Sequence, residues 1–353
     1  MRYPTIKGFV TLIALLFLLM ITGCGNAGSD ETASKQNAND TYSNGDVTHI
    51  RLAGTLPVSH HISKALEDYV GLINEKGEGK IDAVYYPSGQ LFEDNAILEA
   101  IPSGTVEMAQ INYDKWSGVV PSSELFSIPG LYTEFEQIHE ALDSEIGALL
   151  REDMQEIGVE PMVWLDFGLA YLASTDEPIN NKESFKNKKI RSTGTLSLEF
   201  VEDMGASPAS VSGAEVTEAL STGVIDAAFS GVTSFASRKY YDFTDYFTGP
   251  FFSFPHILVA NKEWYDSLPG DIQDILKESA EEVMHSVRQA ATEEEQKATE
   301  ESEANGLQYV EPTEDDIQLW YSESENAINN WLNRSGERGE ELLEKSKELL
   351  GKE

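Results

Sequence analysis

Strand and helix patterns alternate along the chain, and this alternation limits the possible folds more than any other feature. The first half has alternating apolar residues at 48–53, a helix pattern over 60–76 and a second strand pattern at 81–87. A helix pattern over 93–104 and a short strand at 105–111 complete a βαβαβ order. Because a strand–helix–strand crossover joins parallel strands, we expect an α/β fold with helices covering a mostly parallel sheet.

The same alternation returns in the second half. Strands are expected at 159–167, 187–193 and 224–230, and helices at 195–205 and 214–223. No long linker separates the halves, which favours two lobes connected by several chain crossings. Ligands of α/β sheets bind at the carboxyl ends of strands, and clefts between lobes are frequent binding sites.

The last third of the chain has mainly helical patterns. Residues 268–306 predict one long helix with a single apolar face, and Asp271 near its start suits the helix dipole. Further helices are expected within 314–350, where Trp320 and Trp331 are candidate packing residues.

Residues 1–24 have the features of a bacterial lipoprotein signal peptide. A basic start precedes the short apolar stretch 8–22, and the segment ends in Ile-Thr-Gly-Cys at Cys24, the only cysteine of the chain. This ending resembles a lipobox, so we expect lipidation of Cys24; an uncleaved membrane helix is the alternative. Residues 25–46 are small and polar, which predicts a flexible tether to a membrane.

The charge balance excludes some classes of partner. Asp and Glu total 61 against 25 Lys and Arg, a formal net charge of −36, and such a field repels nucleic acid. The sequence has no P-loop, no HExxH and no GxSxG motif, so an enzyme is the weaker hypothesis. The adjacent residues His60 and His61 are a poor metal pair, and we expect neither metal nor cofactor.

Several stretches together resemble the extracytoplasmic solute-binding proteins of TRAP transporters, of the dicarboxylate-binding (DctP) type. The stretches that carry the resemblance lie between about residues 48 and 345, and they are 85–109, 124–132, 187–195, 205–231, 238–248 and 261–276. The resemblance implies a two-lobed periplasmic-binding-protein-like α/β fold with an interlobe cleft and a long spanning helix. Lobe I is then 47–167 plus about 256–290, and lobe II is 168–255 plus about 291–353.

The resemblance also implies a ligand anchor. Family members hold a ligand carboxylate with an arginine on a second-lobe strand, and Arg191 in the stretch Lys188-Lys189-Ile190-Arg191 matches that position. The guanidinium fork suits a carboxylate, since it can donate two parallel hydrogen bonds. A surface arginine in a basic loop is the alternative reading.

Three positions depart from the family pattern. Ala170 replaces a frequent second arginine, Ser230 replaces an asparagine, and Gly213 replaces an aromatic residue. Because they occupy contact positions of the family, Ser230 and Gly213 remain candidate ligand contacts. Each change removes bulk or polar groups. We therefore expect a small organic acid that is less polar than a sugar acid, with one carboxylate held by Arg191 alone.

Further candidate ligand contacts follow from family positions and strand ends. Thr55, Asp94 and Asn112 match contact positions of the first lobe, although Asp94 could equally be an ordinary first-turn helix residue. The aromatic candidates could instead belong to the core, and they are Tyr113, Trp116, Trp164, Phe167 and Phe235.

These features together predict an extracytoplasmic lipoprotein that binds a small carboxylate by closure of two lobes. The resemblance implies delivery of that ligand to the TRAP membrane subunits, no catalysis, and a monomer. A sensory co-receptor and, less favoured, a lipid-anchored extracellular enzyme are the alternatives. The tether favours the surface of a cell with one membrane over a periplasm.

Overall fold

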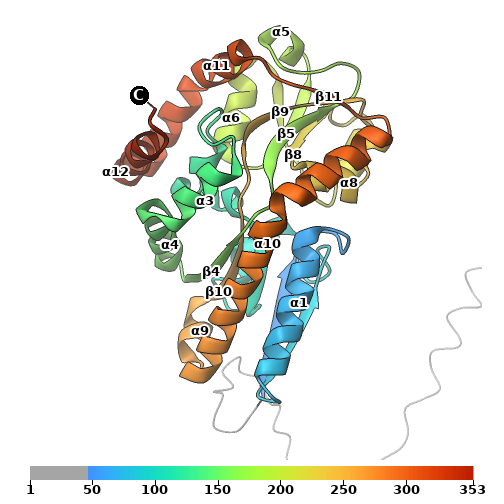
Figure 1. Ribbon diagram of the computed structural model, residues 1–353. Coiled ribbons are helices and arrows are strands. Elements are labelled where there is room, and N and C mark those ends of the chain that lie inside the picture. The colour runs from blue at the N-terminus through green and yellow to red at the C-terminus, as the bar shows by residue number, and fades with distance from the viewer. Residues whose placement is uncertain (1–46, 353) are drawn as a thin grey trace, which may run out of the picture. The chain divides into compact units, whose positions relative to one another are not determined.

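The computed structural model describes residues 47–352 (Figure 1). The predicted signal peptide, Cys24 and the tether at 25–46 lie outside the described residues. Within residues 47–352, no helix combines the length and apolar character needed to cross a membrane.

The described residues form two mixed sheets. The strands are β1 Thr48–Gly54, β2 Ile81–Tyr86, β3 Met108–Asn112, β4 Val159–Leu165, β5 Leu169–Ser174, β6 Lys189–Ser192, β7 Ser207–Ser210, β8 Ala227–Ser230, β9 Tyr246–Ser253, β10 His256–Asn261 and β11 Gln308–Val310. A five-stranded sheet has the order β2-β1-β3-β10-β4, and a six-stranded sheet has the order β11-β9-β5-β8-β6-β7. The mixed α/β architecture confirms the predicted fold class.

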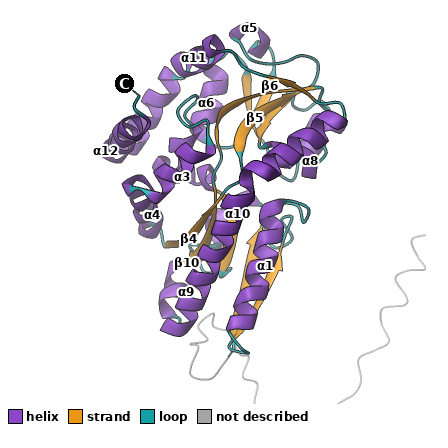
Figure 2. Cartoon of the chain, in the orientation of Figure 1, coloured by secondary structure: helices purple, strands orange, loops and turns teal. Residues whose placement is uncertain are grey.

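Helices cover both sheets, as Figure 2 shows. They are α1 His61–Lys76, α2 Asp94–Ala100, α3 Phe135–Asp143, α4 Glu145–Glu156, α5 Lys182–Phe185, α6 Thr195–Asp203, α7 Val216–Ser221, α8 Val232–Ser237, α9 Lys262–Ser267, α10 Gly270–Ala304, α11 Glu314–Glu323 and α12 Glu325–Leu350. Three short 3₁₀ helices are η1 Tyr113–Gly118, η2 Pro121–Ser127 and η3 Tyr240–Asp242.

The sheets are less parallel than the sequence predicted. β1 pairs in parallel with β2 and β3, and β6 pairs in parallel with β7 and β8, but β10 and β5 run antiparallel to both of their neighbours. These two strands follow β9 and β4 without an intervening helix and lie in the other sheet. The rule that a crossover helix joins two parallel strands does not apply where no helix separates consecutive strands. It therefore cannot predict the direction of β5 and β10.

Three segments connect the two sheets. The chain passes from one sheet to the other between β4 and β5 and again between β9 and β10. Gly168 lies in the first passage with φ of 122°, a backbone conformation that side chains strongly disfavour. The third segment is α10, which contacts α1 and β4 at one end and α8 and β11 at the other (Figure 1). The predicted long spanning helix is confirmed by α10.

Hydrophobic burial explains which strands lie in the middle of each sheet. Every residue of β3, β8 and β10 is buried, whereas outer strands such as β2 and β7 alternate with exposed residues. Strands covered on both faces need continuous apolar sequence. The two lobe boundaries named above stay a prediction.

Candidate functional site

A cavity lies where four parallel strands end. The carboxyl ends of β1 and β3 in one sheet and of β6 and β8 in the other all contribute residues to it. The volume is about 40 Å³, counted as the space that the centre of a water molecule can reach. This is the edge at which α/β sheets bind ligands. The lining residues are Thr55, Leu56, Asp94, Asn112, Lys115, Phe167, Arg191, Thr193, Gly213, Ser230, Ser234, Arg238, Tyr240, Phe254 and His256.

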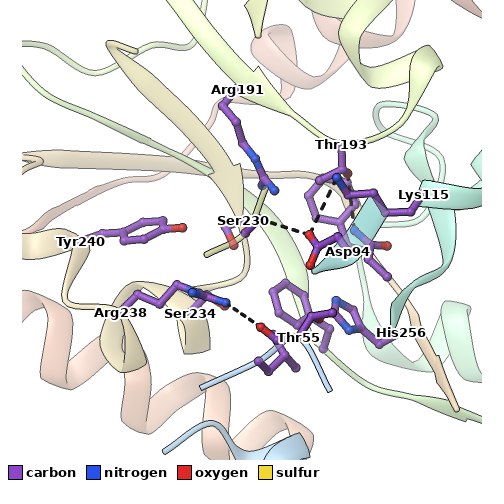
Figure 3. A pocket seen from close by; sticks show the side chains of 15 residues that line it. Thr55, Asp94, Lys115, Arg191, Thr193, Ser230, Ser234, Arg238, Tyr240 and His256 are labelled. Carbon is purple, nitrogen blue, oxygen red and sulfur yellow. Dashed lines mark hydrogen bonds and ion pairs between the residues drawn. The ribbon is translucent and has the colours of Figure 1, made fainter. Parts of the chain in front are cut away.

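Arg191 points from β6 into this cavity, as Figure 3 shows. Its Nε donates to the carbonyl of Val211 at 3.0 Å, and its Nη1 donates to the carbonyl of Phe229 at 2.9 Å. These two bonds fix the guanidinium plane, while Nη2 makes no hydrogen bond to residues 47–352. The side chain is buried and, within this described part, forms no ion pair. Burial lowers the pKa of Arg191, but a guanidinium remains charged in proteins.

Two further cations line the cavity, and neither was among the residues expected from the sequence. Lys115 follows the end of β3 in η1, and Arg238 follows the end of α8. Arg238 donates from Nη2 to the carbonyl of Thr55 at 3.2 Å. Arg191 is therefore not the only cation that lines the cavity, and the expectation that it holds a ligand carboxylate alone stays a prediction. That expectation rested on position 170, where Ala170 is fully buried in the core, while the second and third positive charges come from other elements.

Asp94 supplies the negative charge of the cavity. Its Oδ2 accepts a hydrogen bond from the backbone N–H of Gly213 at 3.2 Å, and Lys115 Nζ lies 3.8 Å from the same oxygen. Asp94 starts α2, whereas Gly213 precedes α7 on the side of the six-stranded sheet. Asn112 Nδ2 similarly donates to Thr193 Oγ1 at 3.4 Å. Direct hydrogen bonds thus join the elements on the two sides of the cavity.

His256 contributes a neutral hydrogen-bond donor. Gln110 fixes the ring, because its Oε1 accepts from the backbone N–H of Thr55 and its Nε2 therefore donates to His256 Nδ1. The imidazole then carries its proton on Nε2. Burial, aided by His61 and Arg238, lowers the pKa of His256 to about 3, so the ring is uncharged at neutral pH.

An apolar wall lies beside His256. The ring of Phe167 stacks on His256 with centroids 4.4 Å apart and on His60 with centroids 5.4 Å apart. His60 also bonds through Nε2 to the hydroxyl of Thr233 in α8 at 3.1 Å. Phe167 therefore packs between residues of different elements at a passage between the sheets.

The structure brings together seven of the residues expected to bind ligand. They are Thr55, Asp94, Asn112, Phe167, Arg191, Gly213 and Ser230. The other expected residues are fully buried outside the cavity, and they are Tyr113, Trp116, Trp164 and Phe235.

Core packing accounts for the aromatic residues outside the cavity. Tyr113 packs edge-on against Trp164 at 4.8 Å, and Phe235 packs on Phe247 and Tyr240. A residue at a strand end lies near the site, but successive side chains point in different directions. Some of them therefore face the core and not the cavity. Lys115 could have been found as a charged residue within three positions of a strand end, whereas no pattern singled out Arg238.

Groups that could hold a metal ion are not found among the described residues. Within residues 47–352, no three His, Cys, Asp or Glu side chains lie close enough together to bind one metal ion.

Comparisons with known proteins agree with this arrangement. The chain is 25% identical over 261 residues to the C4-dicarboxylate-binding periplasmic protein DctP of Rhodobacter capsulatus, covering 73% of this chain and 78% of that protein. A solute receptor of Bordetella pertussis that binds pyroglutamic acid has a TM-score of 0.80 at 17% identity, covering 85% and 100% of the two chains. A TRAP solute-binding protein of Chromohalobacter salexigens with bound D-glucuronate has a TM-score of 0.79 at 22% identity, covering 85% and 99%.

These structural likenesses establish the shared fold, and the family assignment comes from the sequence. The model of the bacterial extracellular solute-binding proteins, family 7, matches residues 52–334. This range includes every residue that lines the cavity. The chain therefore belongs to family 7 of the bacterial extracellular solute-binding proteins (DctP).

Proposed function

We propose that the protein is an extracytoplasmic solute-binding lipoprotein that captures a small organic acid between two lobes. It then delivers the acid to the membrane subunits of an ion-gradient-driven TRAP transporter, without turnover. The observation that carries the proposal is the buried guanidinium of Arg191, whose Nη2 is left for a ligand by the bonds to Val211 and Phe229. A carboxylate matches that free edge in shape and charge.

The cavity supports an acid rather than a neutral solute. Its lining holds the cations Lys115, Arg191 and Arg238 against the single carboxylate Asp94. The small volume favours a compact acid, and the proteins named above bind acids that range from pyroglutamate to glucuronate. The charged lining weakens the expectation of a ligand with a largely apolar body.

A thermal-shift screen of the full-length protein against mono- and dicarboxylates tests the proposal. A ligand at 100 times its dissociation constant stabilises the folded state by about 2.7 kcal/mol, which raises the melting temperature by a few degrees. The shift should vanish in Arg191→Gln and persist in Arg338→Gln, which removes an arginine paired with Glu152 and Asp153 instead. Absence of any carboxylate-dependent shift would refute the proposed ligand class.

Delivery to a permease needs its own experiment. Membrane subunits encoded beside this protein should import the identified acid into proteoliposomes only when the binding protein and an ion gradient are both present. Uptake that does not depend on this protein would refute delivery and favour the sensory alternative.

The lipid anchor at Cys24 is tested separately. Mass spectrometry of the protein from its host should show an acylated N-terminal fragment beginning at Cys24, and Cys24→Ser should release the protein from the membrane fraction. Recovery of unmodified Cys24 in the membrane fraction would contradict the anchor. We also propose that the released protein is a monomer, which its mass in solution will check.

A further inference from the structure

We propose that Glu295 of α10 is a positioning residue for ligand capture, because it holds the passage from β4 to β5 in the conformation that closes the cavity. The inference rests on the proposed function, since it needs two lobes that open and close around a ligand. Glu295 does not line the cavity, and the sequence pattern gave it no role. It acts through the backbone at Gly168 and Leu169 and makes no contact with the ligand.

The three segments that connect the two sheets meet at the peptide group between Gly168 and Leu169. The hydroxyl of Ser253, at the end of β9, donates to the carbonyl of Gly168 at 3.5 Å. The N–H of Leu169 donates to Oε2 of Glu295, in α10, at 3.2 Å. Rotation of one sheet against the other has to change backbone angles in these segments, so bonds to this peptide group restrain opening.

The conformation that these bonds hold is a closed one. Direct hydrogen bonds join the elements on the two sides of the cavity, as between Asp94 and Gly213 and between Asn112 and Thr193. The contact of Glu295 with the passage therefore belongs to the arrangement in which the cavity is shut.

The carboxylate of Glu295 is fitted closely to the passage. Its Oε1 accepts from the hydroxyl of Tyr171 at 3.0 Å, and the ring of Tyr171 packs edge-on against Phe247 and Tyr309. A Cβ at position 168 would lie 3.0 Å from Oε2, which is tighter than an ordinary contact. Only glycine therefore lets the carboxylate approach the peptide group without displacement.

Glu295 differs from the acidic residues beside it on α10. Glu293 and Glu294 both form ion pairs with Lys297, and the side chain of Glu293 is 71% exposed. Glu295 is partly buried, and its two oxygens accept from a backbone N–H and a phenol instead. Burying a carboxylate costs free energy, so this placement is not explained by a surface ion pair.

The same passage forms part of the ligand site. Phe167, the residue before Gly168, lines the cavity and stacks on His256. Its carbonyl accepts from the hydroxyl of Thr233 in α8 at 3.2 Å. Side chains from three elements thus hold residues 167–169 in place, and loss of the contact from α10 would free one end of this run. The cavity wall at Phe167 could then move, and the bound acid would be released sooner.

Release kinetics separate this role from a merely structural one. Glu295→Leu removes both acceptor oxygens, whereas Glu295→Gln keeps an acceptor for the N–H of Leu169. The probes are succinate, pyroglutamate and D-glucuronate, and the one that the unaltered full-length protein binds most tightly is used. Stopped-flow kinetics should give a dissociation rate constant about tenfold higher in Glu295→Leu, with the association rate constant unchanged within about twofold.

Two variants serve as controls for these rate constants. Glu295→Gln should release the acid no more than about twofold faster than the unaltered protein. Glu293→Leu makes the same substitution at the exposed, ion-paired neighbour and should leave both rate constants unchanged. A purely structural defect would lower the fraction of folded protein without changing the rate of release from that fraction.

A distance measurement tests the inference without any ligand. Glu75→Cys in α1 and Glu183→Cys in α5 introduce exposed labelling sites on elements that lie far apart in Figure 1, in a Cys24→Ser background. Single-molecule energy transfer between dyes at these sites should show that Glu295→Leu reduces the closed population by at least about threefold.

The outcomes distinguish this inference from the proposed function. If carboxylates bind but a folded Glu295→Leu variant releases them at the unaltered rate, the role of Glu295 is wrong and the proposed function stands. An unchanged closed population in Glu295→Leu would also overturn it. If no carboxylate of the screen binds, the proposed function fails, and the energy-transfer experiment still tests the restraint on opening.

Discussion

Glu124 accepts a hydrogen bond from the backbone N–H of Leu196, and this contact joins η2 to the first turn of α6. α6 begins four residues after Arg191, so the bond helps to fix the segment that carries the ligand anchor. The carboxylate is completely buried and also receives a bond from Arg334 Nη2 at 3.1 Å.

The titration of Glu124 predicts a specific pH dependence of stability. Burial raises its pKa from 4.5 to about 7. Between these values the folded protein holds a proton that the unfolded chain has released, so this group's contribution to the unfolding free energy falls as pH rises through that window. The loss amounts to about 3 kcal/mol across the window.

Denaturant unfolding at several pH values will check this effect. Glu124→Gln should show a shallower fall in stability between pH 4.5 and 7 than the unaltered protein. Glu295→Gln provides a second case, because burial raises the pKa of Glu295 to about 7 as well. Identical slopes for Glu124→Gln and the unaltered protein would show that Glu124 titrates alike in both states.

Gly213 should control the space available to the ligand. A Cβ at this position would lie 3.6 Å from both Arg238 Nη2 and Asp94 Oδ2, an ordinary contact distance. Gly213→Ala should therefore fold and bind nearly normally, whereas Gly213→Leu should fill the cavity and lower ligand affinity by at least about tenfold. Isothermal titration calorimetry of both variants will measure these affinities. If Gly213→Leu binds the ligand as tightly as the unaltered protein does, the ligand does not occupy this cavity.

The aromatic residues should divide into two groups by their effects. Trp164→Phe leaves a gap in the core, and we expect a loss of about 1–3 kcal/mol in unfolding free energy with unchanged ligand preference. Phe167→Leu alters the wall next to His256 and should change ligand affinity. A change of ligand preference in Trp164→Phe would contradict its assignment to the core.

Sequence patterns predicted the strands and helices that alternate. The family resemblance pointed to Arg191, Thr55 and Asn112, which all line the cavity, whereas Tyr113 and Trp116, chosen because they follow a strand end, lie outside it. The patterns failed where the chain passes between sheets without a helix, as at β5 and β10. They also missed Arg238, because nothing local links a residue after a short helix to the carbonyl of Thr55, 183 positions earlier. Charged residues that face one another across a cavity can be far apart in the sequence. The hydrophobic periodicity and the spacing of motifs therefore do not reveal that they meet.

The central claim is that Arg191 anchors a ligand carboxylate, and calorimetric titration of Arg191 variants with the tightest acid of the screen tests it most directly. Arg191→Gln should weaken binding by about 100-fold, and Arg191→Lys should restore part of that loss, because lysine keeps the charge but not the planar fork. Affinity within about threefold of the unaltered protein in a folded Arg191→Gln variant would contradict the account.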